Sequence, residues 1–359
     1  MRRLATMTVA IATCGFVLTA CGTAADDDKG SDDKSAAPTC KTTKIEGDPK
    51  VAIAYDVGGR GDQSFNDSAY AGLQKAKGEF SGLESTEGEA SQDEDEATRE
   101  ERLRGFADDG FNTVVGVGFA YSESVNKVAP DYPNVAFAVV DGFDPDKDQN
   151  CNVAYLTFAE NEGSFLVGAA AALQSKTGKL GFVGGVNNAL IQKFEAGFKA
   201  GAEAAKPGTE VTSTYIEQSD PKGFGDPAGG KSAAEGLYSD GADIVFHAAG
   251  GSGSGVFDAA VEADKEAIGV DSDQYKTASA KQREHIITSM LKRVDIATYD
   301  FIKSVEGGTP LASYNAFALK DDGVGFSTSG NFLSKDTITK VNAFRDQIIA
   351  GDVKVPEKP

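Results

Sequence analysis

The stretch "YDVGGRGDQSFNDSAYAG", residues 55–72, directly follows the short apolar run "VAIA". The run predicts a buried strand, the glycines predict a loop, and apolar residues recurring at three- and four-residue spacing from Phe65 predict a helix. The loop carries the carboxylates Asp56 and Asp62, and Phe65 and Asn66 open the helix. Such a unit places polar and aromatic groups at the carboxyl end of a strand, where open α/β sheets bind ligands.

The same alternation of strand and helix continues through the rest of the chain. The predicted strands are "KVAIAYD", "NTVVGVG", "VAFAVVD", "NVAYLTF", "KLGFVGG", "EVTSTYI", "DIVFHAA", "EAIGVD" and "IITSML". The predicted helices are the one after Ser64 and residues 94–109, 162–177, 191–205, 229–241, 255–263, 294–306 and 336–350. Strands with little polar alternation between helices predict an α/β fold with parallel sheets buried on both faces.

A weak internal echo divides this body into two halves. "VAIAYDVGGRGDQSFNDSAYAGLQKA" and "KLGFVGGVNNALIQKFEAGFKAGAEAA" each contain a strand, a glycine-containing loop, an aromatic residue and a helix with "AG". Two similar lobes would place both loops at a shared cleft. Within the first unit, Ser64 and Asp67 also have the spacing of a helix-capping box.

The N-terminal segment has the features of an export signal. Residues 1–20, "MRRLATMTVAIATCGFVLTA", contain two arginines, an apolar stretch too short for a membrane span, and small residues. They end in "LTAC", which matches the bacterial lipobox and predicts lipid attachment at Cys21; the alternative is cleavage nearby with Cys21 left as a thiol. Residues 21–43 are small and acidic and predict a flexible stalk.

Charge and cysteine content narrow the function classes. The formal net charge is −20, which argues against a nucleic-acid partner because such partners require a basic face. With two histidines and no paired cysteine motif, a His/Cys zinc site is not expected. Cys40 and Cys151 can form a disulfide outside the cytoplasm, or they can remain two free thiols.

Six motifs in order carry a family resemblance: "DVGGRGDQSFNDSAYAG", "NEGSFLVGAAAAL", "EAGFKAG", "AAGGSGSGVFDAA", "IGVDSDQY" and "ITSMLKRVD". They resemble the basic membrane protein family of lipoproteins, purine-nucleoside-binding substrate-binding proteins of ABC importers. The resemblance implies a type I periplasmic-binding-protein fold, in which two Rossmann-like lobes are joined by a three-stranded hinge. The implied lobes are residues 44–155 with 289–315, and residues 156–288 with 316–359.

The resemblance also implies residues for the base of a nucleoside. Phe65 and Phe246 would stack on the two faces of the base, one from each lobe. Asp56 and Asp141 each end a predicted strand, and ionised carboxylates accept hydrogen bonds from purine N–H groups. Asn66 offers a donor and an acceptor to the base edge. Each of these side chains also has a structural alternative: the rings can be core residues, and the polar side chains can be helix caps or loop acids.

For the ribose, the expected residues are Gly251, Asp273 and Lys292, with Asp271 ranked after Asp273. Glycine permits close backbone approach, a carboxylate accepts from the diol, and the ammonium donates to a hydroxyl and balances Asp273. A solvated surface cation is the alternative for Lys292. His247, next to Phe246, is expected to face away from the ligand.

The expected function is capture of a purine nucleoside and delivery to an ABC permease by a monomer anchored to the extracytoplasmic membrane face through Cys21. Neither a chemical step nor a cofactor is expected. One alternative is a sensor or surface module of the same fold, because fold does not decide function. An NAD-dependent enzyme is disfavoured because the glycine pattern from Gly251 reaches Val256 where the dinucleotide fingerprint needs glycine or alanine. A nucleoside hydrolase is also disfavoured, because the chain has no metal-binding motif such as closely spaced aspartates at one strand end.

Overall fold

The computed structural model describes residues 45, 47–145 and 150–359. The predicted signal peptide, lipidation site Cys21, stalk and Cys40 lie outside these residues. Cys151 is disulfide-bonded, so it is not a free thiol. The described residues belong to one compact unit. No helix in the described part of the chain is both long and apolar enough to span a membrane.

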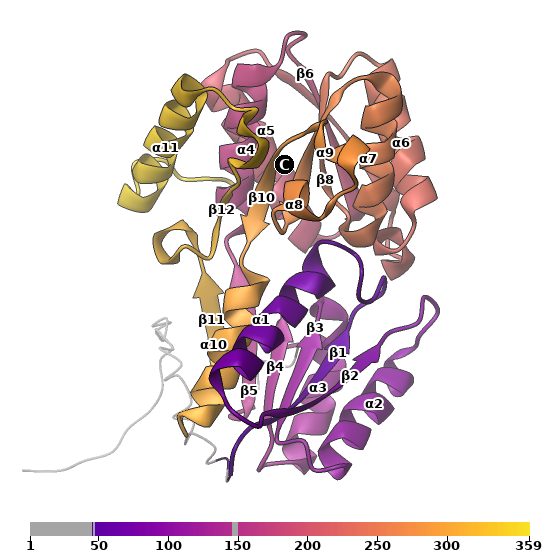
Figure 1. Ribbon diagram of the computed structural model, residues 1–359, viewed down its shortest axis with the longest axis vertical. Helices are drawn as coiled ribbons and strands as arrows, with labels where there is room; N and C mark the ends of the chain where they lie inside the picture. Colours follow the sequence, from indigo (N-terminus) through magenta and orange to yellow (C-terminus); the bar gives the residue numbers. More distant parts are fainter. Residues whose placement is uncertain (1–44, 46, 146–149) are drawn as a thin grey trace, which may run out of the picture. The chain divides into compact units, whose positions relative to one another are not determined.

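The first lobe is built on a six-stranded, all-parallel sheet with the order β11-β5-β4-β3-β1-β2. Its strands are β1 (Lys50–Tyr55), β2 (Glu84–Glu89), β3 (Thr113–Val117), β4 (Ala136–Val140), β5 (Val153–Phe158) and β11 (Ser313–Phe317). Helices α1 (Phe65–Glu79) and α10 (Val294–Glu306) lie side by side on one face (Figure 1). Helices α2 (Glu96–Asp108) and α3 (Ser122–Val128) cover the other.

Strand β1 shows why this sheet is buried on both faces. Val51 and Ile53 pack in the core cluster that includes Leu73 of α1, whereas Ala52 and Ala54 pack in the cluster that includes Leu103 of α2. Successive side chains of a strand point to opposite faces, so an uninterrupted apolar run satisfies both helical layers.

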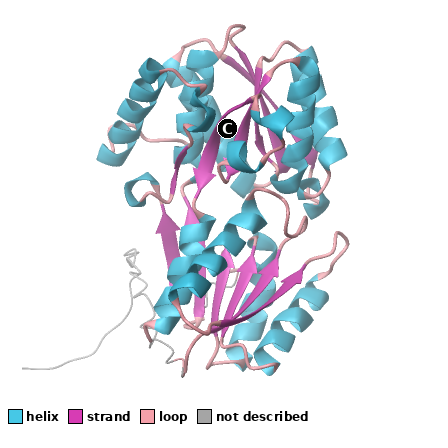
Figure 2. Ribbon diagram, in the orientation of Figure 1, coloured by secondary structure: helices cyan, strands magenta, loops and turns pink. Residues whose placement is uncertain are grey.

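The second lobe repeats this layering, with helices on both sides of the strands (Figure 2). Its sheet has the order β12-β10-β9-β8-β6-β7, and only β12 is antiparallel in the described sheet. The strands are β6 (Lys179–Val186), β7 (Glu210–Glu217), β8 (Ile244–Ala248), β9 (Glu266–Asp271), β10 (Ile286–Lys292) and β12 (Val324–Phe326). The helices are α4 (Glu160–Gln174), α5 (Ala189–Ala205), α6 (Pro227–Ser239), α7 (Gly253–Ala263), α11 (Lys335–Ala350) and the short α8 (Gln274–Thr277) and α9 (Ala280–Arg283).

Within the described residues, the chain passes between the lobes three times, from β5 to α4, from β10 to α10 and from β11 to β12. The boundaries expected near residues 155, 289 and 315 are corrected. Strand β5 pairs with β4 through Leu156, β10 pairs with β9 through Leu291, and β11 pairs with β5 through Phe317. The sequence of a strand does not reveal which sheet it joins, so all three boundaries fell inside strands.

Candidate functional site: a cavity between the lobes

A cavity lies between the two lobes and is lined by residues of both. Its walls come from the carboxyl ends of β1, β3 and β4 in the first lobe and of β8, β9 and β10 in the second, with the beginnings of α1 and α5. Both halves of the internal echo therefore contribute to one cleft, the first through its loop and the beginning of α1, and the second through the beginning of α5.

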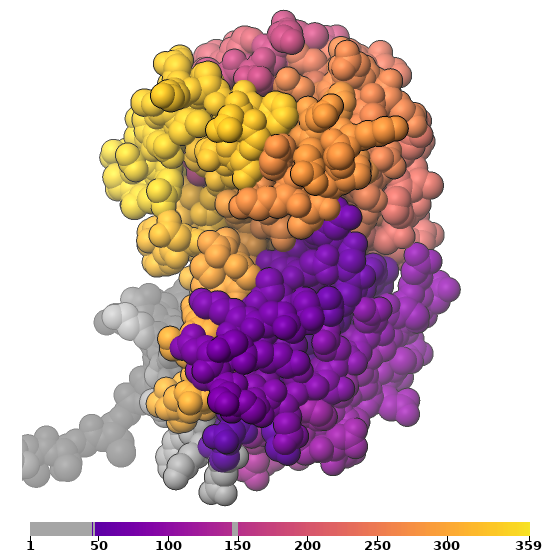
Figure 3. Space-filling model, viewed as in Figure 1, coloured from indigo at the N-terminus to yellow at the C-terminus, as the bar shows by residue number. Residues whose placement is uncertain are grey.

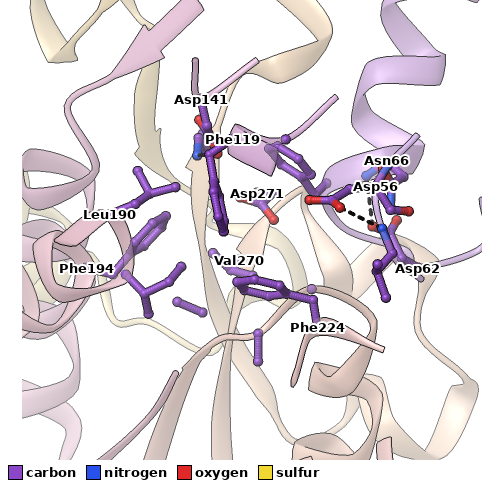
Figure 4. A pocket seen from close by; sticks show the side chains of 18 residues that line it. Asp56, Asp62, Asn66, Phe119, Asp141, Leu190, Phe194, Phe224, Val270 and Asp271 are labelled. Carbon is purple, nitrogen blue, oxygen red and sulfur yellow. Dashed lines mark hydrogen bonds and ion pairs between the residues drawn. The ribbon is translucent and has the colours of Figure 1, made fainter. Parts of the chain in front are cut away.

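Four phenylalanine rings line this cavity among the described residues. Phe65 and Phe119 belong to the first lobe, whereas Phe194 and Phe224 belong to the second. Figure 4 shows Phe119, Phe194 and Phe224 around the central space. Phe119 and Phe224 meet edge to face across the lobes, with ring centroids 6.3 Å apart. The rings form an apolar enclosure suited to a flat aromatic ligand.

Phe246 is not one of these rings, which corrects its expected role as a stacking plate. It lies in the middle of β8, is fully buried, and packs its ring 5.1 Å from that of Phe198. The cavity is lined instead by Ala248 and Ala249, farther along the same strand and turn. His247 is also fully buried, and its Nε2 lies 3.0 Å from Oε1 of Gln274.

Four aspartates also line the cavity: Asp56, Asp62, Asp141 and Asp271. Burial raises the pKa of Asp56 to about 6 and that of Asp271 to about 7. Burial also raises the pKa of Asp62. Close carboxyls in an apolar enclosure disfavour one another's ionised forms, so a ligand that donates hydrogen bonds would relieve this cost.

The loop before α1 is organised by Asp62, which the sequence indicated only as a loop acid. Its carboxylate accepts from the backbone N–H groups of Ser64, Asn66 and Asp67 at 2.8–3.1 Å. The predicted Ser64–Asp67 capping box is therefore wrong, because the Ser64 hydroxyl makes no capping bond. Asp62 takes that role from within the loop and fixes the positions of the residues that open the helix.

Asn66 is buried beside Asp56 (Figure 4), and its side-chain amide forms a hydrogen bond with the backbone. Its Oδ1 accepts from the Asp56 N–H at 3.1 Å. Gly118 packs closely on the other side, where an added β-carbon would lie only 2.2 Å from Oδ2 of Asp56. The φ of Gly118 is +109°, a value that other residues rarely adopt. Asn66 and Gly118 together fix the position of Asp56.

Lys292 ends β10 and is buried in the cavity wall. Its Nζ lies 2.6 Å from Oδ2 of Asp141 and 3.3 Å from Oε1 of Glu160. Burial opposes its charge, but Asp141, Glu160 and Asp271 raise the pKa of Lys292 overall. The alternative of a solvated surface cation is wrong, since 2% of the side chain is exposed.

Two residues expected at the ribose lie outside the cavity lining. Asp273 accepts from the Ser329 hydroxyl at 2.5 Å and pairs with Lys276, so it does not balance Lys292. Asp271, two residues earlier at the end of β9, occupies the wall instead. Gly251 lies between the lobes, because an added β-carbon would lie 3.3 Å from the Phe224 carbonyl oxygen and 3.6 Å from Cβ of Asp62; Gly250 lines the cavity.

Asp141 and Asp271 occupy matching places in the two lobes. One follows β4 and the other ends β9, and their φ values are +60° and +61°. Left-handed backbone at a non-glycine residue is uncommon and clusters at functional sites. The same backbone turn thus directs a carboxylate into the cavity from each side.

The lobes are closed on each other around this cavity. Gln92 Nε2 donates to the Gly225 carbonyl at 3.2 Å, and the Ser64 hydroxyl donates to Asp271 at 2.5 Å. In the space-filling view, the indigo surface around α1 meets the orange surface of the second lobe (Figure 3). A ligand in this cavity would therefore be enclosed by both lobes.

Residues 50–359 match the family described as ABC transporter substrate-binding protein PnrA-like. The chain belongs to this family. The resemblance to the basic membrane protein family is therefore confirmed, and it covers the whole two-lobed body. Members are substrate-binding proteins rather than enzymes, which favours a binding role for the cavity.

Curated relatives agree with this assignment. The chain is 38% identical to the CD4+ T-cell-stimulating antigen of Listeria innocua, over 96% of each chain. It is 34% identical to the ABC transporter nucleoside-binding protein BmpA of Lactococcus lactis, over 88% of this chain and 91% of the relative. Basic membrane protein A1 of Borrelia garinii is also 34% identical, over 86% and 88%.

Solved structures support the fold. An ABC transporter solute-binding protein from Aeropyrum pernix matches with a TM-score of 0.74 and 29% identity, covering 86% of this chain and 94% of that one. One from Conexibacter woesei matches with a TM-score of 0.68 and 25% identity, over 86% and 99%. The expected type I periplasmic-binding-protein fold is confirmed. The described residues include no His/Cys/Asp/Glu group that could hold a metal ion.

Proposed function

We propose that this protein captures a purine nucleoside between its lobes and delivers it to an ABC permease. The observation that carries the proposal is the enclosed cavity, in which phenylalanine rings and aspartate carboxylates face the same space. Aromatic rings stack on a base at about 1–3 kcal/mol per base, and a bicyclic purine offers them the larger face. The relative from Lactococcus lactis is named for nucleoside binding, which supports the same ligand class.

The charges of the cavity favour a neutral ligand that donates hydrogen bonds. Ionised carboxylates are acceptor-only and match the N–H groups of a base and the hydroxyls of ribose. Lys292, the single cation in the described lining, is already held by Asp141 and Glu160. A phosphate would face four aspartates with no free cation in this lining, so nucleosides should bind and nucleotides should not.

The roles of the wall residues follow from their positions. Phe65 and Phe224, from opposite lobes, hold the base, and Asp56 with Asn66 faces its edge. Asp271, Gly250 and Lys292 with Asp141 face the ribose. Binding shifts the equilibrium from open to closed lobes, and the closed form docks on the permease without a chemical step or a cofactor.

Titration calorimetry on protein that has been unfolded and refolded, to remove carried ligand, tests the ligand class. We expect tight binding of adenosine, guanosine or inosine, and weak or no binding of cytidine, ribose, NAD and the matching 5′-monophosphates. Binding of ribose in place of nucleosides would contradict the proposed ligand class but not the fold assignment. Binding of NAD alone would favour an enzyme.

The proposed location is the extracytoplasmic face of the cell membrane, with a monomer anchored through lipid on Cys21. Mass spectrometry of the protein extracted from membranes should find a lipid-modified N-terminal cysteine. The Cys21→Ala variant should lose membrane attachment. Light scattering on the extracted protein should give the mass of one chain, and a dimer mass would contradict the monomer.

A further inference from the structure

Ser64 makes three hydrogen-bond contacts across the cleft, although it does not line the cavity; the longest joins its hydroxyl to the Val270 carbonyl at 3.4 Å. Its hydroxyl donates to Oδ2 of Asp271 at 2.5 Å, and its carbonyl oxygen accepts from the hydroxyl of Ser272 at 2.9 Å. Ser64 lies directly before Phe65 in the first lobe, whereas Asp271 ends β9 in the second lobe and Ser272 follows it. Ser64 is fully buried, and the bond from its hydroxyl to Asp271 is shielded from water.

The Asp271 carboxylate lines the cavity and also accepts a hydrogen bond from the opposite lobe. It lines the cavity, and Figure 4 shows it facing the central space. Its Oδ2 is engaged by Ser64 of the opposite lobe. One carboxylate can accept several hydrogen bonds at once, so contact with a ligand and contact with Ser64 are compatible. Opening of the lobes would separate Ser64 from Asp271.

The charged groups around Asp271 come from several elements. Lys292 on β10 and the Ser64 hydroxyl favour its ionised form, whereas burial, Asp141 after β4 and Asp62 before α1 oppose it. The balance raises the pKa of Asp271 to about 7. Loss of the Ser64 donor would raise this pKa further, since a hydrogen bond to a charged form stabilises that form.

We infer that Ser64 is a positioning residue that orients the Asp271 carboxylate toward the ligand and holds the closed lobes together. Retention of the ligand would then depend on a hydrogen bond between the lobes that involves neither the ligand nor the hinge. The inference rests on the proposed nucleoside function for its ligand readout. The contact forms only when the lobes close, so it slows dissociation and leaves the encounter of ligand with the open form unaffected. The hydrogen bond from the Ser272 hydroxyl to the Ser64 carbonyl is a second contact between the lobes.

The test compares three single substitutions in the full chain with the wild-type protein. Ser64→Ala removes the hydroxyl that contacts Asp271, and Ser272→Ala removes the bond to the Ser64 carbonyl. Ser254→Ala is the matched control, because the Ser254 hydroxyl donates to the Gly251 carbonyl at 2.9 Å within the second lobe and crosses no cleft. Rates are measured with radiolabelled adenosine, guanosine and inosine, chased by unlabelled ligand, between pH 5.5 and 8.5.

We expect Ser64→Ala to accelerate dissociation about 10- to 100-fold, the range for a hydrogen bond to a charged group, with association changed less than about twofold. Affinity should fall as pH drops below about 7, and Ser64→Ala should move this midpoint upward. Ser272→Ala should accelerate dissociation about 2- to 10-fold without moving the midpoint, because its bond is to a backbone oxygen. Ser254→Ala should match the wild type in both respects.

Small-angle scattering of the unliganded protein gives a readout that needs no ligand. Ser64→Ala should shift the population toward open lobes and increase the radius of gyration, whereas Ser254→Ala should not. If the wild type binds no nucleoside, the proposed function fails and this measurement alone decides the inference. The inference would be overturned if Ser64→Ala had the same dissociation rate, the same pH midpoint of affinity and the same radius of gyration as the wild type. If Ser64→Ala does not fold, the partly exposed Ser272→Ala decides through dissociation and scattering.

Discussion

The ammonium of Lys292 lies 2.6 Å from Oδ2 of Asp141 inside the cavity wall, with 2% and 5% of the two side chains exposed. Asp141 belongs to the first lobe, whereas Lys292 ends a strand of the second. Glu160, at the beginning of α4, shares the same cation at 3.3 Å. The two carboxylates are therefore stable in this wall only while the lysine is charged.

Lys292→Met should lower the free energy of unfolding by about 3–5 kcal/mol at pH 7.5, because it leaves buried carboxylates without their cation. Urea denaturation measures the change. Lys276→Met is the matched control, since Lys276 is 70% exposed in its pair with Asp273 and should change stability by less than about 0.5 kcal/mol. The deficit of Lys292→Met should shrink at pH 5, where carboxyls can take up protons. Equal effects of the two substitutions would contradict the buried pair.

Substitutions of Phe224, which lines the cavity, and Phe246, which was expected to do so, should have different effects. Phe224→Ala should weaken binding of a purine nucleoside by about 1–3 kcal/mol, since it removes a ring from the cavity. Phe246→Ala should lower the free energy of unfolding by about 3–5 kcal/mol, because it leaves a void in the core. Calorimetry and urea denaturation of both variants separate the two effects. A larger affinity loss in Phe246→Ala, with stability retained, would restore Phe246 as the stacking ring.

Asp271→Asn should stabilise the unliganded protein at high pH. Burial raises the pKa of Asp271 to about 7, so between about pH 4 and 7 the folded state holds a proton that the unfolded state releases. Stability due to this group is present at low pH and is lost as pH rises, by at most about 1.4 kcal/mol per pH unit. The variant and the wild type should therefore be similar at pH 5, and the variant should be more stable at pH 8. Thermal unfolding across this range checks the sign; a destabilised variant at pH 8 would contradict it.

Gly118→Ala should weaken nucleoside binding through Asp56. The new β-carbon would lie 2.2 Å from Oδ2 of Asp56, so the carboxylate must move, and the φ of +109° adds backbone strain. We expect at least a tenfold loss of affinity, measured by calorimetry. Gly178→Ala separates the effect of backbone strain from that of carboxylate displacement. Gly178 also has a positive φ, +72°, but no atom lies within 4 Å of an added β-carbon. Similar affinity in the two variants would contradict the role of Gly118.

Much of the fold was readable in the sequence. All nine predicted strands form, because buried strands of parallel sheets are continuous apolar runs. Three strands were missed, and each lies at a sheet edge: β2, β11 and β12. Strand β2, "ESTEGE", has no large apolar residue and is defined by its pairing with β1. An edge strand needs only one neighbour, so its composition carries little signal.

The site was predicted in outline and corrected in detail. Asp56, Phe65, Asn66, Asp141 and Lys292 all line the cavity, and their roles toward a ligand stay predictions; Asp141 is now proposed at the ribose instead of the base, because it holds Lys292. Phe194 could have been found through the internal echo, which places it near the beginning of the second helix. Phe224 ends the short 3-10 helix Pro221–Phe224, which is too short to show a periodic pattern, and no sequence pattern points to it.

The sequence by itself determined the alternation of strands and helices, the presence of two related halves, and the acids and rings at strand ends, because these depend on local patterning of apolar and polar residues. Only the tertiary structure decided between Asp271 and Asp273, and between Phe224 and Phe246. Whether a side chain reaches the cavity depends on where its strand ends relative to its neighbours and on how far the lobes close. Both are set by contacts between residues such as Ser64 and Asp271, more than two hundred positions apart.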